Sequence, residues 1–124
     1  MVSQILADPD YGTSACTDIV CGASPHPSIG VEGWAHQGSN TALVGKITKP
    51  FMLLPAGNDA DDYRPGGGIW DTLVASSPTS ELVDDFKEMT HGWSVRGDIA
   101  DPKVDRDVQK AINHIVGFFN KHAK

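Results

Sequence analysis

The feature that most constrains the fold is the segment Phe51–Ala56, Phe-Met-Leu-Leu-Pro-Ala, an apolar run of strand length. Lys49-Pro50 precedes it and Gly57-Asn58 follows it, so turn-forming residues bound it on both sides. A second, near-continuous apolar run with β-branched residues covers Asp18–Ser24. Strands without polar alternation are buried on both faces, as in parallel sheets covered by crossover helices. We therefore predict a mostly parallel sheet flanked by helices.

The most secure helix is predicted near the carboxyl end of the chain. Its apolar residues recur at spacings of three and four and define one stripe: Val104, Val108, Ala111, Ile112, Ile115, Val116 and Phe119. Weaker patterns predict the end of a helix over Val2–Ala7, loops with a short helix within Ile29–Val44, a helix over Ile69–Val74 and a strand over Leu82–Met89. Strands alternating with helices predict an α/β fold, and the 124 residues form one domain, 1–124.

Composition excludes several classes of partner. The formal net charge is -6 and no basic patch is visible, which disfavours nucleic acid and anionic membrane surfaces. No window approaches the roughly eighteen apolar residues of a membrane span. The start, Met1–Asp8, lacks the basic and apolar regions of a secretory signal. We expect a cytoplasmic protein without a nucleic-acid or membrane partner.

The residues that most often bind metals or phosphates give no recognisable motif. Cys16 and Cys21 lie five positions apart, and Cys21 is predicted to be a reduced core residue. A site built from His26, His36 and His91 matches no zinc spacing. The glycines at 66–68 lack the Lys-Ser/Thr of a phosphate-binding loop and predict a flexible loop instead. We expect neither a metal nor a cofactor.

Three candidate reactive residues, His26, Asp59 and His91, each follow a predicted strand. The carboxyl ends of strands meet at one edge of an open α/β sheet, where side chains share a crevice. Acyl transfer needs an imidazole oriented by a carboxylate, and Asp59 followed by His91 is the chain order of acid and base in α/β hydrolases. Asp59 as a turn residue and His91 as an ordinary loop histidine remain alternatives.

Further residues are candidates for substrate binding. His26 is held extended between Pro25 and Pro27, which predicts either a loop-anchoring hydrogen bond of its side chain or a position in a pocket wall. Arg64 and Arg96 are each able to hold a substrate carboxylate by paired hydrogen bonds. Trp93 is expected in a pocket wall or in the core.

Three motifs in order resemble the dienelactone hydrolase family: His26-Pro27-Ser28, Ala56-Gly57-Asn58-Asp59, and Thr90-His91-Gly92-Trp93 continued by Arg96-Gly97-Asp98. The resemblance covers residues from about Met1 to Phe119 and corresponds to the carboxyl-terminal half of a family member. It implies a partial α/β-hydrolase fold without the amino-terminal strands, acting on small esters or lactones through a Cys-Asp-His triad. Asp59 is then the triad acid and His91 the base, with His26, Trp93 and Arg96 at the substrate.

The sequence departs from the family at the nucleophile, because it contains no Gly-x-Cys-x-Gly-Gly turn. The resemblance implies a cysteine a few residues upstream of Met1. Cys21 belongs inside a strand and is no replacement, whereas Ser28 is better placed but lacks the flanking glycines of a nucleophile turn. We expect this chain alone to be inactive. Without the early strands one sheet edge is bare, which predicts aggregation or a homodimer.

A different class of function remains open. The chain is alternatively a non-catalytic remnant that binds a small acid or a partner protein through its exposed sheet edge. A metal-dependent hydrolase is a third hypothesis and requires stoichiometric zinc in the purified protein.

Overall fold

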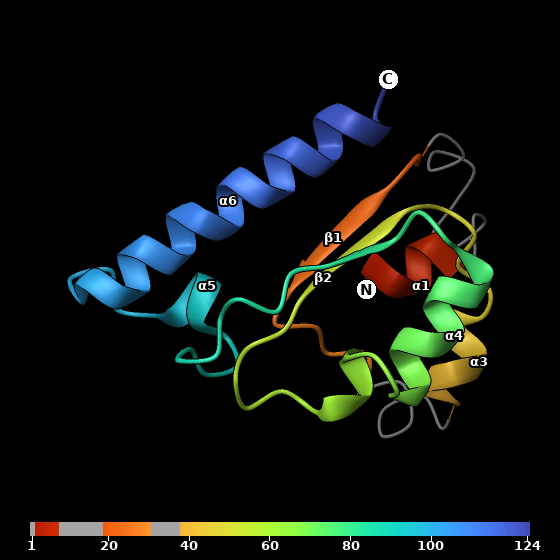
Figure 1. Cartoon of the computed structure of the whole chain (residues 1–124), viewed down its shortest axis with the longest axis horizontal. Helices are drawn as coiled ribbons and strands as arrows, with labels where there is room; N and C mark the ends of the chain where they lie inside the picture. Colours follow the sequence, from red (N-terminus) through yellow and green to blue (C-terminus); the bar gives the residue numbers. More distant parts are fainter. Residues whose placement is uncertain (1, 8–18, 31–37) are drawn as a thin grey trace.

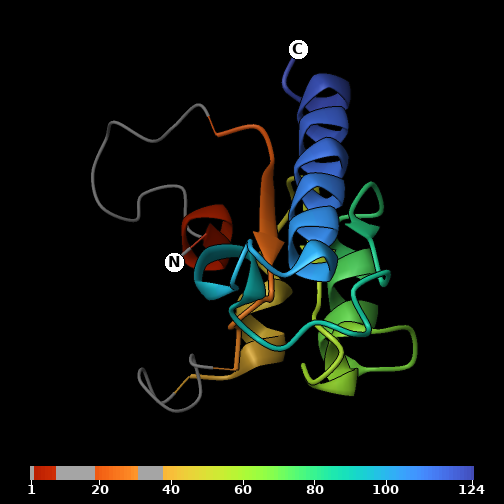
Figure 2. The same cartoon turned by 90° about the vertical axis from the view of Figure 1, so that its left-hand side faces the viewer.

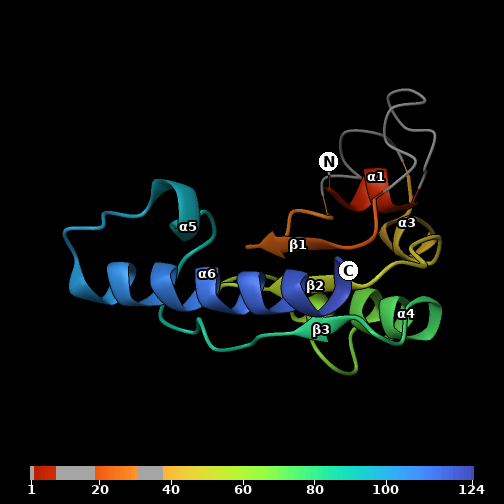
Figure 3. The same ribbon diagram turned by 90° about the horizontal axis from the view of Figure 1, so that it is seen from above.

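The computed structural model describes residues 2–7, 19–30 and 38–124. Within these residues, three parallel strands form one sheet in the order β1-β2-β3. Figure 1 labels β1 and β2, and Figure 3 labels all three strands. The strands are β1 (Gly22–Pro25), β2 (Phe51–Leu54) and β3 (Glu81–Leu82). The helices are α1 (Val2–Ala7), α3 (Asn40–Val44), the 3-10 helix η1 (Asp61–Tyr63), α4 (Gly68–Ser76), α5 (Trp93–Arg96) and α6 (Pro102–His122). The prediction of an α/β fold with a parallel sheet is confirmed.

The central strand β2 separates two hydrophobic cores. All four of its residues are buried, as its apolar run predicts. Phe51 and Leu53 point into one core, and Met52 and Leu54 point into the other, because side chains alternate across a strand. β2 therefore contributes side chains to both cores.

The two cores lie on opposite faces of the sheet. The first contains side chains from α1, α3, η1 and α4, among them Leu6, Val44, Tyr63, Ile69 and Leu73. The second contains side chains from α5, α6 and the segment after β3, among them Val83, Phe86, Trp93, Ala111 and Phe118. Figure 2 shows α1 and α6 on opposite sides of β1. This is the covering of both faces that a parallel strand requires.

The longest helix, α6, begins at a well-formed cap. The side chain of Asp101 accepts a hydrogen bond from the backbone amide of Lys103, and Pro102 occupies the first turn. The helix runs alongside the strands (Figure 3) and buries Ala111 and Phe118.

The apolar stripe predicted for this helix is only partly covered. Ile112, Val116 and Phe119 are 47%, 51% and 39% exposed, whereas Val104, Val108 and Ile115 pack against the second core. α6 contacts β1 and β2, and the second core covers only part of the stripe. The stripe is therefore wider than the surface against which α6 packs among the described residues.

Two predicted strands differ from the observed ones. β1 begins at Gly22 rather than at Asp18, and Asp18 lies outside the described residues. The strand predicted over Leu82–Met89 is wrong, because β3 ends at Leu82 and only an isolated bridge between Ala56 and Phe86 follows. Asp84 and Asp85 interrupt the run, and each pairs with a cation outside the sheet.

The three weaker helical predictions are confirmed, with small differences in their bounds. α1 has the predicted bounds, α4 extends the predicted Ile69–Val74 by one residue before and two after, and α3 is the short helix expected within Ile29–Val44. None of the helices among the described residues combines the length and apolar character needed to cross a bilayer.

Candidate active site

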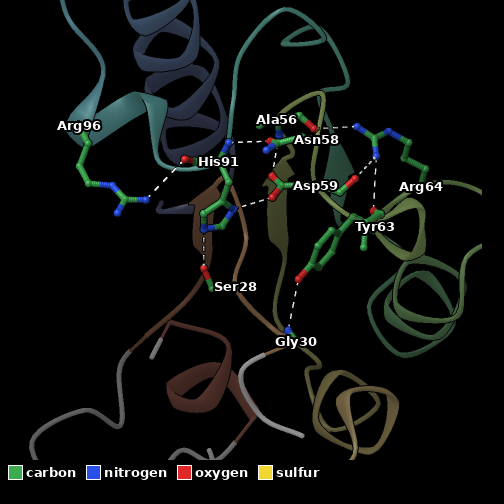
Figure 4. Close-up of polar contacts among 10 residues, drawn as sticks. Ser28, Gly30, Ala56, Asn58, Asp59, Tyr63, Arg64, His91 and Arg96 are labelled. Atoms are coloured by element: carbon green, nitrogen blue, oxygen red, sulfur yellow. Dashed lines mark hydrogen bonds and ion pairs between the residues drawn. The ribbon is translucent and has the colours of Figure 1, made fainter. Parts of the chain in front are cut away.

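Three loops meet where the parallel strands end. One follows β1 and carries His26 and Ser28, one follows β2 and carries Asp59, and one follows the Ala56–Phe86 bridge and carries His91. Figure 4 shows Ser28, His91 and Asp59 in a continuous line of polar contacts. The sheet thus brings together residues that are far apart along the chain.

The loop after β2 holds Asp59 in a buried turn. One carboxylate oxygen of Asp59, Oδ2, accepts a hydrogen bond from the backbone amide of Ala56 at 2.7 Å. The backbone amide of Asp59 donates in return to the carbonyl oxygen of Ala56 at 3.1 Å. The side chain of Asp59 is only 5% exposed. Asp59 is therefore a turn residue, as the alternative expected, and its other carboxylate oxygen remains available to a second donor.

Arg64 fixes this loop from the outside. Its guanidinium donates to the carbonyl oxygens of Ala56 (3.0 Å) and Asp59 (3.1 Å) and to the carboxylate of Asp84 (3.0 Å). These contacts use the N–H donors of the guanidinium within the protein, so Arg64 stabilises the loop and is not free to hold a substrate carboxylate.

The His91 loop is attached to the Asp59 loop through the backbone. The amide of Gly57 donates to the carbonyl oxygen of Met89 at 2.9 Å, and the amide of His91 donates to the side-chain oxygen of Asn58 at 2.7 Å. A Cβ atom at Gly57 would lie 2.0 Å from the carbonyl oxygen of Lys87. Only glycine permits this approach of the two loops.

The imidazole of His91 connects an acid to a hydroxyl. Its Nδ1 lies 2.5 Å from Oδ1 of Asp59, and its Nε2 lies 3.2 Å from Oγ of Ser28. An ionised carboxylate only accepts hydrogen bonds, so the imidazole donates from Nδ1, and in the neutral ring Nε2 is then free to accept from the serine. The His91 side chain is 37% exposed, in contrast to the buried acid. The geometry is that of a general base oriented by a carboxylate.

Ser28 was not among the expected catalytic residues, because no glycines flank it. The structure obtains the required turn differently. His26 adopts a left-handed backbone conformation with φ of 41°, so the prediction that it is extended is wrong, and Pro27 is fully buried. The exposed Ser28 is thereby placed beside His91. The left-handed conformation of a histidine between two prolines gives no recognisable signal in the sequence.

His26 packs its ring edge against His91, with ring centroids 4.9 Å apart and an interplanar angle of 75°. Both ring nitrogens of His26 are buried without a hydrogen-bond partner among the described residues. The expected loop-anchoring hydrogen bond is therefore wrong, and His26 instead forms part of the wall of the site. Burial lowers the pKa of His26, and the nearby His91 lowers that pKa further, so the ring is neutral near pH 7.

A cavity of about 460 Å³ adjoins His91 and is lined in part by Trp93, Arg96, Lys103 and Val104. Trp93 is buried, and the centroid of its ring lies 4.7 Å from that of Phe86. It is therefore a core residue that also lines the cavity. The guanidinium of exposed Arg96 donates to the carbonyl oxygen of His91 at 3.5 Å. The cavity has the size of a small-molecule site.

The remaining candidates lie elsewhere. Cys21 precedes β1, is partly buried against the second core, and has its thiol pKa raised by burial. In the loop at 66–68, the amide of Gly66 donates to the carboxylate of Asp71 at the start of α4. Cys16 and His36 lie outside the described residues. Among the residues that the structure describes, no three His, Cys, Asp or Glu side chains gather as metal ligands.

The chain matches no protein-family model, and comparisons with curated proteins and with solved structures gave no match either.

Proposed function

We propose that the chain is the carboxyl-terminal part of an α/β-hydrolase domain, similar to dienelactone hydrolases, which hydrolyses small esters or lactones. The observation that supports this proposal best is the contact of Asp59 with Nδ1 of His91, which leaves Nε2 on the opposite side of the ring facing a hydroxyl. Its acid is buried and its imidazole is open to solvent on one side. This is the arrangement that an acyl-transfer enzyme needs to draw a proton from a nucleophile.

In this mechanism each residue has a separate role. His91 accepts the proton of the nucleophile at Nε2 and later returns it to the leaving alcohol. Asp59 holds the proton of Nδ1 and stabilises the imidazolium that forms. Base catalysis by a positioned imidazole contributes roughly 10²–10⁴-fold. The resemblance implies a cysteine of a Gly-x-Cys-x-Gly-Gly turn as the nucleophile.

The surroundings of His91 favour a small substrate. The cavity beside it is lined by Trp93 and Arg96 and also by the acidic residues Glu88, Asp98 and Asp101. The lining therefore carries both charges, and its volume suits a small ester or lactone. The ring of His26 packs against that of His91 in an edge-to-face contact.

The test is hydrolysis of 4-nitrophenyl acetate and of the lactone dihydrocoumarin by the native protein. We expect His91→Ala and Asp59→Asn each to lower kcat/KM by at least about a hundredfold. His114→Ala, which removes a histidine of α6 outside the three loops, is the matched control and should retain full activity. Full activity in His91→Ala would overturn the proposal.

A further inference from the structure

We propose that Ser28 is itself an acyl-accepting nucleophile, whose hydroxyl is activated by His91. This inference rests on the proposed hydrolase function and deepens it by assigning the nucleophile to a residue of the described chain. It differs from what the family resemblance implies, namely a cysteine in a glycine-rich turn.

The sheet brings Ser28, Asp59 and His91 to the same edge. Ser28 follows β1, Asp59 follows β2, and His91 follows the bridge that extends the β3 side of the sheet. Their order along the chain is Ser, Asp, His, which is the order of the triad in α/β hydrolases. Neighbouring parallel strands thus deliver the members of a serine triad to one edge.

The hydrogen bonds have the directions that activation requires. Because Nδ1 of His91 donates to Asp59, Nε2 carries a lone pair that points to Oγ of Ser28 at 3.2 Å (Figure 4). Ser28 is exposed, so an ester is able to reach its oxygen from solvent. Asp59, by contrast, is shielded, and its two carboxylate oxygens contact the imidazole and the amide of Ala56.

The turn that carries Ser28 is fixed on both sides. Before it, Pro27 is fully buried and His26 is held in the left-handed region. After it, Ile29 is buried in the first core, and the amide of Gly30 donates to Oη of the buried Tyr63 at 3.3 Å. A hydroxyl on a turn anchored in this way keeps its orientation toward the base, which is what a nucleophile needs.

The described cysteine does not compete for this role. Cys21 lies at the amino end of β1, whereas Ser28 and His91 lie at the carboxyl end. Burial raises the pKa of the Cys21 thiol, which disfavours the reactive thiolate.

The proposed reaction balances with water as the only co-reactant. Oγ of Ser28 bonds to the carbonyl carbon while its proton passes to Nε2 of His91. The carbon–oxygen bond to the alcohol breaks, and the alcohol takes that proton. Water then attacks the acyl-serine and gives a proton to His91, which returns it to Oγ as the acid leaves. A lactone yields one hydroxy acid, because its alcohol remains attached.

The experiment uses diisopropyl fluorophosphate, which forms an oxygen–phosphorus bond with an activated serine and releases fluoride. We expect tandem mass spectrometry to locate one phosphoryl adduct on Ser28 of the native protein. The adduct should be absent from Ser28→Ala, His91→Ala and heat-unfolded protein. Ser94→Ala is the matched control and should be labelled normally, since its hydroxyl has no partner among the described residues. An adduct on another residue would overturn the assignment.

A second variant keeps the test independent of any loss of folding in Ser28→Ala. Ser28→Cys retains the turn and places a thiol at Nε2 of His91, which should make it a thiolate near neutral pH. We expect this thiol to react with iodoacetamide at least about tenfold faster than the same thiol in the double variant that also carries His91→Ala. Equal rates in the two variants would contradict activation by His91.

Ester hydrolysis separates this inference from the proposed function. If His91→Ala and Asp59→Asn abolish hydrolysis but Ser28→Ala does not, the hydrolase function stands and Ser28 is not its nucleophile. If the native protein hydrolyses neither substrate and takes no label, both proposals fail. Loss of hydrolysis in all three variants, with the adduct on Ser28, supports both.

Discussion

The side-chain oxygen of Asn58 accepts a hydrogen bond from the backbone amide of His91 at 2.7 Å. Asn58 stands next to Asp59, which holds the imidazole of the same histidine. Two adjacent residues of one loop therefore fix both the backbone and the ring of His91. The orientation of His91 depends on this pair of contacts rather than on Asp59 alone.

Asn58→Ala should lower kcat/KM for ester hydrolysis by about fivefold, because a lost hydrogen bond of roughly 1 kcal/mol loosens the backbone under His91. Stability to urea should change little, since the contact is exposed to solvent. Asn120→Ala on the exposed side of α6 is the control, with no expected change. Equal activity of the two variants would show that Asp59 orients His91 unaided.

Gly57→Ala should destabilise the protein by about 2 kcal/mol or more, because its Cβ would lie 2.0 Å from the carbonyl oxygen of Lys87 and force the loops apart. Hydrolysis should fall as Asp59 and His91 separate. Gly117→Ala is a matched substitution at a helical position where an added Cβ meets nothing within 4 Å. It should stabilise the protein by about 0.5–1 kcal/mol in urea unfolding. A harmless Gly57→Ala would contradict the close approach of the loops.

Neighbouring phenylalanines on α6 offer a test of the second core. Phe118 is buried and Phe119 is 39% exposed. Phe118→Ala should cost about 3–5 kcal/mol of unfolding free energy because it leaves a cavity, and Phe119→Ala should cost less than about 1 kcal/mol. Urea denaturation of both variants measures the difference. Similar losses would mean that α6 packs through a different face.

His26 makes stability depend on pH. Burial lowers the pKa of the folded His26 below its ordinary value of 6.5, so the unfolded chain binds the proton more readily. This contribution to stability is present above about pH 6.5 and is lost as the pH falls below it. His26→Asn tolerates the left-handed backbone and does not titrate. Its unfolding free energy should decline less than that of the native protein between about pH 8 and about pH 5. Parallel declines would exclude His26 as the cause.

The exposed apolar residues of α6 predict self-association. Ile112 and Val116 lie on the uncovered part of the stripe, and β1 is an edge strand of the described sheet. We expect the chain to bind an apolar dye and to elute above monomer mass, and Ile112→Lys with Val116→Lys should reduce both effects. A monomer without dye binding, with one sharp thermal transition, would refute this expectation.

The sequence predicted those elements whose pattern matches their environment. Phe51–Leu54 is buried on both faces and reads as a continuous apolar run, and the long helix repeats apolar residues at the helical period. The segment after Leu82 could not be predicted, because its single bridge at Phe86 leaves no alternation for the sequence to show. Its carboxylates pair with Arg64 and Lys110, which are distant in the chain.

Part of the candidate site was predictable from the sequence, namely the pair Asp59 and His91, whereas the contact with Ser28 was not. Asp59 and His91 follow apolar segments that end at one sheet edge, so their proximity follows from the topology. The contact of Ser28 with His91 depends on the left-handed backbone conformation of His26, which residues other than glycine rarely adopt. The ring of His26 meets another ring instead of a hydrogen-bond partner, an outcome that the flanking prolines do not specify.

The order β1-β2-β3 has a consequence for how much this chain tolerates insertions. Ser28, Asp59 and His91 each follow a part of the sheet whose position is fixed by the parallel register. The length of the segments that connect one strand to the next therefore does not set the distances among these three residues. Residues added between the exposed Pro78 and Thr79 would lengthen the crossover that leads into β3 and leave Ser28, Asp59 and His91 in place. One residue added between Leu54 and Asp59 would turn the carboxylate away from the imidazole. Variation in length is therefore permitted at one end of the sheet and forbidden at the other.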